Sequence, residues 1–142
     1  MASSELDHVR IERVKLRVGI DIASVGETAS SIARFGDRYL RRIFTARELV
    51  VLTALTEPEA TAAAAAARFA AKEAAIKVLR PRGAEIDWHD IEVLRCLRGA
   101  PFLRLSGGAA ELAKCARIHQ LSVSLTHEGT LAAAIVIGVG IG

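Results

Sequence analysis

Aromatic residues are scarce in this chain of 142 residues, of which they make up only 4%. Hydrophobic residues nevertheless account for 51%, so we expect a packed core built mostly from alanine, valine, leucine and isoleucine. So few aromatic rings leave little surface on which nucleic-acid bases could stack. The high hydrophobic fraction also argues against a chain that is disordered throughout.

Cysteine is equally rare, and Cys96 and Cys115 form no metal-binding or redox motif. We expect both to be reduced, structural thiols of a cytosolic protein. The N-terminal region carries charges throughout and has no apolar block, so no signal peptide is expected. The apolar run at residues 131–142 is too short to cross a bilayer. These features predict a soluble, cytoplasmic protein without a membrane partner.

Glycine-rich phosphate-binding motifs are also absent: the sequence contains neither G-x-x-x-x-G-K-S/T nor G-x-G-x-x-G. This excludes a P-loop enzyme and a dinucleotide-binding fold of the common kind. The formal net charge is +3, which is compatible with an acidic partner and does not require nucleic acid. The length suits one domain, for which we expect residues 16–142, preceded by an N-terminal extension at residues 1–15.

Hydrophobic patterning predicts an α+β fold in which a mostly antiparallel sheet packs on one long helix. The first strand is expected at residues 16–22, where aliphatic side chains alternate with small or polar ones. Asp21 lies near its end, on the face opposite to the aliphatic one. Two hairpins are expected at residues 91–105 and 122–139, with a short helix at residues 109–118 between them and Cys115 facing inward.

An alanine-rich stretch predicts the longest helix of the chain. Thr56 and Glu59 are placed to form a capping box, and Pro58 suits the first turn. The helix is expected to end near Leu79, because Pro81 cannot continue it. Its many alanines give a smooth surface that other elements can approach closely.

Glu73 and Lys77 are four residues apart in this helix, so both side chains lie on one face. Taken alone they are a common solvated ion pair, worth about a few tenths of a kcal/mol. Asp21 and His127, each near the end of a predicted strand, suggest a second interpretation. Two carboxylates suit Mg²⁺, and a lysine beside them can neutralise a phosphate or assist a leaving oxygen. This set indicates phosphoryl or phosphodiester transfer, although a lone histidine is more often structural.

A helix at about residues 30–39 and the segment after it predict a strongly positive surface, because arginines recur there at spacings of three and four. They are Arg34, Arg38, Arg41 and Arg42. One interpretation is an ordinary solvated basic face, and the other is a docking surface for an acidic protein or a nucleic acid. A further helix is expected to begin at Thr45, with Glu48 as its capping-box partner.

Three segments, in this order, resemble the holo-acyl-carrier-protein synthases, the small trimeric 4'-phosphopantetheinyl transferases. The pattern of that family is G-x-D-I, then R-F-x-x-K-E-A-x-x-K, then S-L/I/V-S/T-H. The corresponding segments are residues 19–22 (GIDI), 68–77 (RFAAKEAAIK) and 124–127 (SLTH). The resemblance covers residues 17–137. Its middle motif is specific, and the other two gain weight from their order around it.

The resemblance implies an enzyme that moves the 4'-phosphopantetheine arm of coenzyme A onto a serine of an apo acyl carrier protein and releases adenosine 3',5'-bisphosphate. It implies that Asp21 and Glu73 bind Mg²⁺, and that Glu73, or a water that it orients, takes the proton of the serine. Lys77 is then expected to contact the phosphate and assist the leaving group. Arg68 and His127 are expected to contact coenzyme A, with His127 near its phosphates. The resemblance also implies a homotrimer with sites between neighbouring subunits.

The resemblance assigns the arginine surface to the docking of acidic carrier proteins, rather than to nucleic acid. Two segments depart from the family pattern. Residues 23–27 (ASVGE) replace an acidic residue and an arginine, and residues 78–83 (VLRPRG) replace a glycine-rich turn. The departures leave open an enzyme dedicated to a polyketide- or peptide-synthase carrier protein, or a non-catalytic relative that binds a carrier protein or coenzyme A. A basic nucleic-acid-binding module is disfavoured by the low aromatic content.

Overall fold

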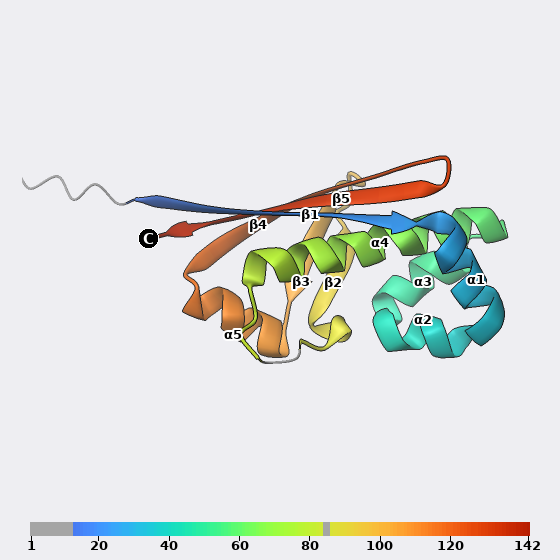
Figure 1. The fold of residues 1–142 in the computed structure, drawn as a ribbon, viewed down its shortest axis with the longest axis horizontal. Helices are drawn as coiled ribbons and strands as arrows, with labels where there is room; N and C mark the ends of the chain where they lie inside the picture. Colours follow the sequence, from blue (N-terminus) through green and yellow to red (C-terminus); the bar gives the residue numbers. More distant parts are fainter. Residues whose placement is uncertain (1–12, 84–85) are drawn as a thin grey trace, which may run out of the picture.

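The computed structural model describes residues 13–83 and 86–142. In chain order its elements are β1 (Val14–Ser24), α1 (Val25–Phe35), α2 (Asp37–Ile43), α3 (Ala46–Ala54), α4 (Pro58–Leu79), the 3-10 turn η1 (Trp88–Asp90), β2 (Ile91–Arg95), β3 (Pro101–Leu105), α5 (Gly107–Cys115), β4 (Ile118–Glu128) and β5 (Leu131–Ile141). This order confirms the predicted α+β class (Figure 1). Most of the predicted N-terminal extension lies outside the described residues.

Three long strands form one antiparallel sheet in the order β1-β5-β4, and β2 and β3 form a separate hairpin. β1 pairs with β5 along its whole length, from Val14 opposite Ile141 to Ser24 opposite Leu131. The three strands run along α4, which lies against one face of their sheet (Figure 1). The predicted packing of antiparallel strands on a long helix is therefore confirmed, with β1 at an edge of its sheet.

Small residues let α4 approach the sheet closely. A Cβ atom at Gly19 of β1 would clash with the carbonyl oxygen of Ala74, and one at Gly138 of β5 would lie 2.6 Å from a methyl group of Val78. Four alanines in the middle of α4 are completely buried: Ala70, Ala71, Ala74 and Ala75. The alanine-rich surface predicted from the sequence thus forms the contact between helix and sheet, because neither side has a side chain long enough to hold the backbones apart.

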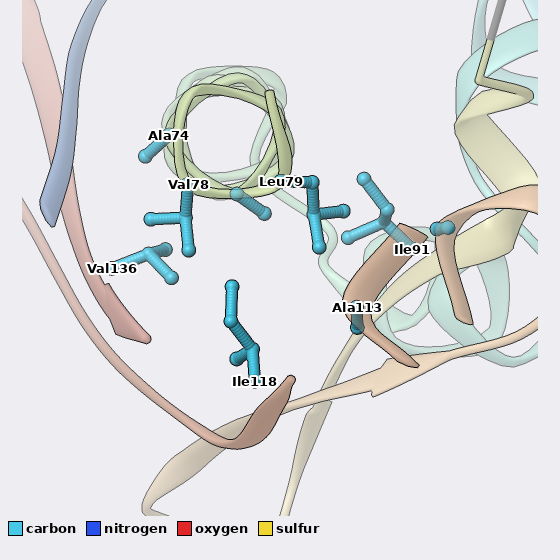
Figure 2. Packing of buried hydrophobic residues seen from close by; sticks show 9 residues of the cluster. Ala74, Val78, Leu79, Ile91, Ala113, Ile118 and Val136 are labelled. Atoms are coloured by element: carbon cyan, nitrogen blue, oxygen red, sulfur yellow. The ribbon is translucent and has the colours of Figure 1, made fainter. Parts of the chain in front are cut away.

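The core beneath α4 is aliphatic. Val78 and Leu79 of α4 point toward Ile118 and Val136 of the long strands, and toward Ile91 of the hairpin (Figure 2). A second cluster joins α2 and α3 to the first half of α4, with Leu40, Ile43, Phe44, Leu52 and Ala65 as its buried members. Phe44 is the only aromatic residue among the buried hydrophobic residues of the described chain, and the others are aliphatic, as the composition predicts.

Gly36 divides the arginine-rich segment into two helices, so the single helix predicted at residues 30–39 is wrong. α1 ends at Phe35, and Gly36 adopts a φ of 54°, which side chains rarely allow. The arginines are consequently split, with Arg34 on α1 and the other three on α2. All four are exposed.

The two predicted capping boxes have different outcomes. At the start of α3, Thr45 Oγ1 accepts a hydrogen bond from the backbone of Glu48, and the Thr45 backbone donates to Glu48 Oε1. This prediction is confirmed. At the start of α4 the N-cap is Glu57 rather than Thr56, and no side chain caps the helix. Pro58 does occupy the first turn, where it lacks an amide proton that would need a partner.

The last helix is shorter than predicted, because the chain turns at Arg117 with a φ of 56°. α5 ends at Cys115, and β4 begins at Ile118. Cys115, which was predicted to face inward, is exposed, as is Cys96, and both are free thiols. None of the helices in the described residues is long and apolar enough to cross a membrane.

The face of the long sheet that points away from α4 is aliphatic and exposed. Alternate residues of β1 lie on it, and each is at least 58% exposed: Val14, Leu16, Val18, Ile20 and Ile22. β5 adds Leu131, Ile135, Ile137 and Ile141. A continuous apolar surface of this kind is unusual on a monomer and marks a site of association. The aliphatic face predicted for the first strand is thus the outer face, and its polar face packs on α4.

Candidate active site

Asp21, Glu73 and Lys77 meet at the seam between β1 and α4. Asp21 lies on the inner face of β1, two residues beyond Gly19, and the other two side chains come from the part of α4 that packs on that strand. Because the contact at Gly19 brings the backbones together, short side chains from the strand and longer ones from the helix can reach one another. The structure therefore brings these three residues, which were grouped from the sequence, to the same place.

Lys77 binds to β1 rather than to its own helix. Its Nζ lies 3.3 Å from Asp21 Oδ1 and donates a hydrogen bond to the Ile20 carbonyl oxygen at 2.6 Å. Within the described residues Lys77 forms no ion pair with Glu73, so the ordinary helix-surface pair considered from the sequence is not formed. The Lys77 and Asp21 side chains are 52% and 22% exposed, and an ion pair in such a setting is worth about 0–1 kcal/mol. Lys77 is thus able to exchange this partner for another.

Glu73 is half-buried beside Asp21. Burial raises the pKa of its carboxyl group, the negative charge of Asp21 raises it further, and Lys77 opposes both effects. Two carboxylates held this close repel each other when both are ionised. A bound cation relieves this repulsion, so the electrostatics of the pair fit a cation site.

The donor set at the seam fits Mg²⁺. Among the described residues there is no cluster of three or more histidine, cysteine, aspartate or glutamate side chains that could hold a metal ion. Mg²⁺ does not need such a cluster, because it commonly binds one or two carboxylates and completes its shell with water and phosphate oxygens. Asp21 and Glu73 supply two carboxylates of this kind.

His127 lies on the same face of the sheet as Asp21 but on another strand. Asp21 and Leu125 both pair with Ala134, so His127 is two strands away and two residues further along. Strand spacing and rise place its Cα roughly 12 Å from that of Asp21. The imidazole is exposed near the end of β4. Within one chain His127 does not join the three residues of the seam.

Arg68 points to another side of α4. It precedes Glu73 by five residues, which is a rotation of about 140° around the helix. It is only 4% exposed, and its Nη1 donates to the Ala64 carbonyl oxygen at 3.2 Å. Its Nε has no hydrogen-bond partner among the described residues, and burial, followed by the charge of Arg95, lowers its pKa. The structure therefore does not bring Arg68 to the seam of its own chain.

Sequence reasoning missed a buried ion pair beside the site. Lys72 is completely buried, and its Nζ contacts Glu48 Oε1 at 2.6 Å and the carbonyl oxygens of Ile91 and Trp88 at 2.6 and 3.0 Å. Glu48 is buried as well, and its Oε2 accepts a hydrogen bond from the Val93 amide. The pair thus connects α3, α4 and the start of the hairpin.

This pair fixes how α4 is rotated about its axis. Lys72 immediately precedes Glu73, so anchoring one side chain in the interior aims the next toward the seam. Burial lowers the pKa of Lys72, while Glu48 acts in the opposite direction. The sequence does contain a signal for one member of this pair, because Lys72 is a charged residue within an alanine-rich helical stretch. Its partner, 24 residues earlier, could not be read from that pattern.

A small cavity of about 220 Å³ continues the seam beyond Asp21. Hydroxyl groups from four residues line it, namely Ser24, Thr28, Ser31 and Tyr39, together with Glu27 and Phe69. Burial raises the pKa of Tyr39, and a hydrogen bond with Thr28 partly offsets that effect. We refer to this space as the hydroxyl cavity. It offers neutral hydrogen-bonding groups next to the charged residues.

Comparison with known proteins agrees with this geometry. A family model described as the 4'-phosphopantetheinyl transferase superfamily matches residues 17–136. A holo-acyl-carrier-protein synthase of Desulforudis audaxviator is 39% identical over 125 residues, which cover 88% of this chain and 93% of the relative.

Solved structures show the same similarity. The acyl carrier protein synthase of Mycobacterium tuberculosis is 34% identical with a TM-score of 0.66, and the match covers 88% of this chain and 96% of that one. The ACPS–CoA complex of Chronobacterium ammoniagenes is 26% identical with a TM-score of 0.75, with 90% and 98% covered. These matches confirm the family resemblance of the three sequence motifs. The chain belongs to the 4'-phosphopantetheinyl transferase superfamily.

Proposed function

We propose that this protein transfers the 4'-phosphopantetheine arm of coenzyme A to a serine of an apo acyl carrier protein. The observation that carries the proposal is the convergence of Asp21, Glu73 and Lys77 at the β1–α4 seam in a member of this superfamily. The relative from Desulforudis audaxviator is named a holo-acyl-carrier-protein synthase, and the Chronobacterium protein is a complex with coenzyme A. Both names support the same reaction.

The chemistry requires a bond between the serine oxygen and the phosphorus that bears the pantetheine arm. The bond from that phosphorus to the bridging oxygen breaks, and adenosine 3',5'-bisphosphate leaves. Asp21 and Glu73 are placed to hold Mg²⁺, which when bound neutralises charge on the diphosphate. Glu73, or a water that it orients, accepts the proton of the serine. Lys77, loosely held by Asp21, turns to the phosphate oxygens and stabilises the leaving group.

A homotrimer with shared sites is part of the proposal. The exposed aliphatic face of β1 and β5 supports association between copies of the chain. The exposed position of His127, which does not reach the seam of its own chain, supports a site completed by a neighbouring subunit. A contact of Arg68 with coenzyme A stays a prediction. Light scattering on the purified protein tests this, with a mass of three chains expected. A monomer that is fully active would contradict it.

An acidic carrier protein is the proposed acceptor. Four exposed arginines on α1 and α2 support its docking. These helices lie at the end of the molecule where β1 ends, three residues after Asp21 (Figure 1). Long-range attraction between this surface and an acidic protein speeds their encounter. The four are Arg34, Arg38, Arg41 and Arg42. A cytoplasmic location, as expected from the sequence, stays a prediction.

The test of the function is direct transfer. The protein is incubated with coenzyme A, Mg²⁺ and apo carrier proteins from fatty-acid, polyketide and peptide synthases, and each acceptor is weighed by mass spectrometry. A gain of one phosphopantetheine is expected on at least one acceptor, and only with Mg²⁺. If a folded trimer modifies none of them and binds coenzyme A regardless of Mg²⁺, the chain is a non-catalytic relative.

A further inference from the structure

A cavity of about 660 Å³ lies between α2, α3 and the turn η1. In Figure 1 these elements lie on the side of α4 that faces away from the long sheet. The cavity shares no lining residue with the hydroxyl cavity, and none of the three seam residues lines it. Its volume is within the range of small-molecule binding sites. We call this space the α2–α3 cavity.

The helix α3 supplies an apolar wall. A surface helix usually turns apolar residues to the core and polar ones to solvent. α3 buries Leu52 completely, yet its outer side carries Val50 and Val51, which are 69% and 46% exposed. Val50 lines the cavity together with its neighbour Leu49. The outer side of α3 therefore offers an aliphatic surface to a ligand.

The opposite wall supplies one permanent positive charge. Arg41 is exposed, lines the cavity and forms no ion pair within the described residues. His89 also lines the cavity, but its Nε2 donates to the Arg41 carbonyl oxygen at 2.7 Å and its Nδ1 lies 3.5 Å from Asp87 Oδ1. None of the described lining residues is acidic. A single guanidinium beside an aliphatic wall suits a ligand with one negative charge and an apolar body.

The walls of the cavity are held in place by hydrogen bonds. Thr45, at the start of α3, donates from its Oγ1 to Glu92 Oε2 at 2.7 Å, which ties α3 to β2. The bond from His89 to the Arg41 carbonyl oxygen ties η1 to α2. The cavity is therefore formed before a ligand arrives, which lowers the entropic cost of binding.

The arginine surface is divided by this cavity. Arg38 and Arg42 line a separate cavity of about 210 Å³ with Phe35 and Tyr39. Arg41 lines the α2–α3 cavity, and the two cavities have no lining residue in common. A carrier protein that docks on Arg38 and Arg42 thus leaves the α2–α3 cavity open to a different ligand.

We propose that the α2–α3 cavity binds an aliphatic carboxylate, with its head group on Arg41 and its chain along Leu49 and Val50. The guanidinium forms charge-assisted hydrogen bonds with the carboxylate, and the chain covers apolar surface that α3 otherwise exposes to water. This ligand site is independent of the proposed transfer reaction. It also gives Arg41 a role that the other arginines of the surface do not share.

The test measures binding of dodecanoate, kept below its micelle concentration, by calorimetry. Fluorescence of the only tryptophan, Trp88, reports binding separately, because its ring packs against the buried cluster of α2 and α3. One site per chain is expected. Val50→Asp puts a carboxylate into the cavity and is expected to weaken binding on the order of tenfold. Val51→Asp is the matched control, because it makes the same change on α3 outside the lining.

The head group is tested with a ligand of the same chain length and opposite charge. Wild-type protein is expected to bind dodecanoate more tightly than dodecyltrimethylammonium. Arg41→Gln removes the permanent cation and is expected to weaken dodecanoate binding on the order of tenfold. The preference between the two head groups is expected to disappear in this variant.

Three results overturn the inference. Equal dodecanoate binding by Val50→Asp and Val51→Asp would place the ligand elsewhere, such as on the exposed aliphatic face of the long sheet. Equal binding of both head groups by the wild type would remove the role of Arg41. Binding to vesicles that contain phosphatidylglycerol, without binding of monomeric dodecanoate, would indicate a membrane surface instead. None of these measurements depends on phosphopantetheine transfer, so the two proposals stand or fall separately.

Discussion

Two lysines of α4, five residues apart, form ion pairs of opposite character. Lys72 and Glu48 are both completely buried and 2.6 Å apart. Lys77 and Asp21 are 3.3 Å apart and partly exposed. The buried pair has a single arrangement, because leaving either charge without its partner in the interior is very costly. The open pair can separate, because water or a phosphate replaces the partner. One pair therefore holds the helix in position, and the other is available for chemistry.

The largest effect is expected at Glu73, whose side chain the buried pair directs toward the seam. Loss of this carboxylate tests whether the buried pair and the open pair have separate roles. We expect Glu73→Gln to lower the rate of transfer on the order of 10³-fold, because it removes a cation ligand and the proton acceptor together. The trimer and its stability are expected to survive. Transfer rates and light scattering on the same sample measure both effects. Glu59→Gln makes the same chemical change on an exposed turn of α4 and serves as the control. Activity of Glu73→Gln equal to wild type would refute the assignment.

The two lysines themselves give the second prediction. Lys72→Met is expected to lower the free energy of unfolding by about 3–5 kcal/mol, because Glu48 is left as an unpaired buried charge. Lys77→Met is expected to change it by less than about 1 kcal/mol. Urea denaturation of both variants measures the difference. Adding Glu48→Gln to Lys72→Met is expected to recover part of the loss. Equal destabilisation by the two methionine variants would contradict the comparison.

The third prediction concerns the close contact that forms the seam. Gly19→Ala places a methyl group against the carbonyl oxygen of Ala74, so helix and strand must move apart. We expect a loss of about 1–3 kcal/mol in the free energy of unfolding, together with weaker coenzyme A binding. Gly26→Ala is the matched control, since the nearest atom to its new methyl group is Ser24 Oγ at 3.8 Å. A Gly19→Ala protein as stable as Gly26→Ala would show that the contact is softer than the structure indicates.

The smallest effect is the pH dependence of stability that arises at the seam. The pKa of Glu73 is raised above its ordinary value of 4.5, so the folded protein binds this proton more tightly than the unfolded chain. Stability is therefore expected to fall as the pH rises from 4.5 through the folded pKa of Glu73. Melting temperatures of wild type and Glu73→Gln across this range measure the effect. The variant is expected to lack this decline, and Mg²⁺ is expected to reduce it in the wild type. Parallel curves for the two proteins would exclude Glu73 as its source.

Much of the fold could be predicted because local patterns are strong in this chain. The capping box at Thr45 and the end of α4 at Leu79 depend on neighbouring residues, and both are as predicted. Gly36 was harder to interpret, since a glycine inside an amphipathic pattern is tolerated in some helices and breaks others. Cys115 was misplaced because the buried side of α5 is the one that carries Ala109 and Ala113, and Cys115 lies about 200° around the helix from Ala113.

The site was predicted in part, for a related reason. Helical spacing places Glu73 and Lys77 on one face of α4, but only the structure shows that this face packs against β1. Spacing does not reveal that Lys77 binds Asp21, because their separation in sequence is 56 residues. Nor does it reveal the Lys72–Glu48 pair, which requires α3 to fold back on α4.

The order of residues alone is enough to establish the α+β class, the three ordered motifs that mark the superfamily, and the alternation of aliphatic with small or polar residues along β1. Which side of that strand is covered depends on the packing of the folded chain. An alternating pattern shows which side chains share a face, but packing chooses the face that a helix can approach. Here glycine and alanine let α4 lie on the polar side. That choice brings Asp21 to Glu73 and Lys77 and leaves the aliphatic side exposed.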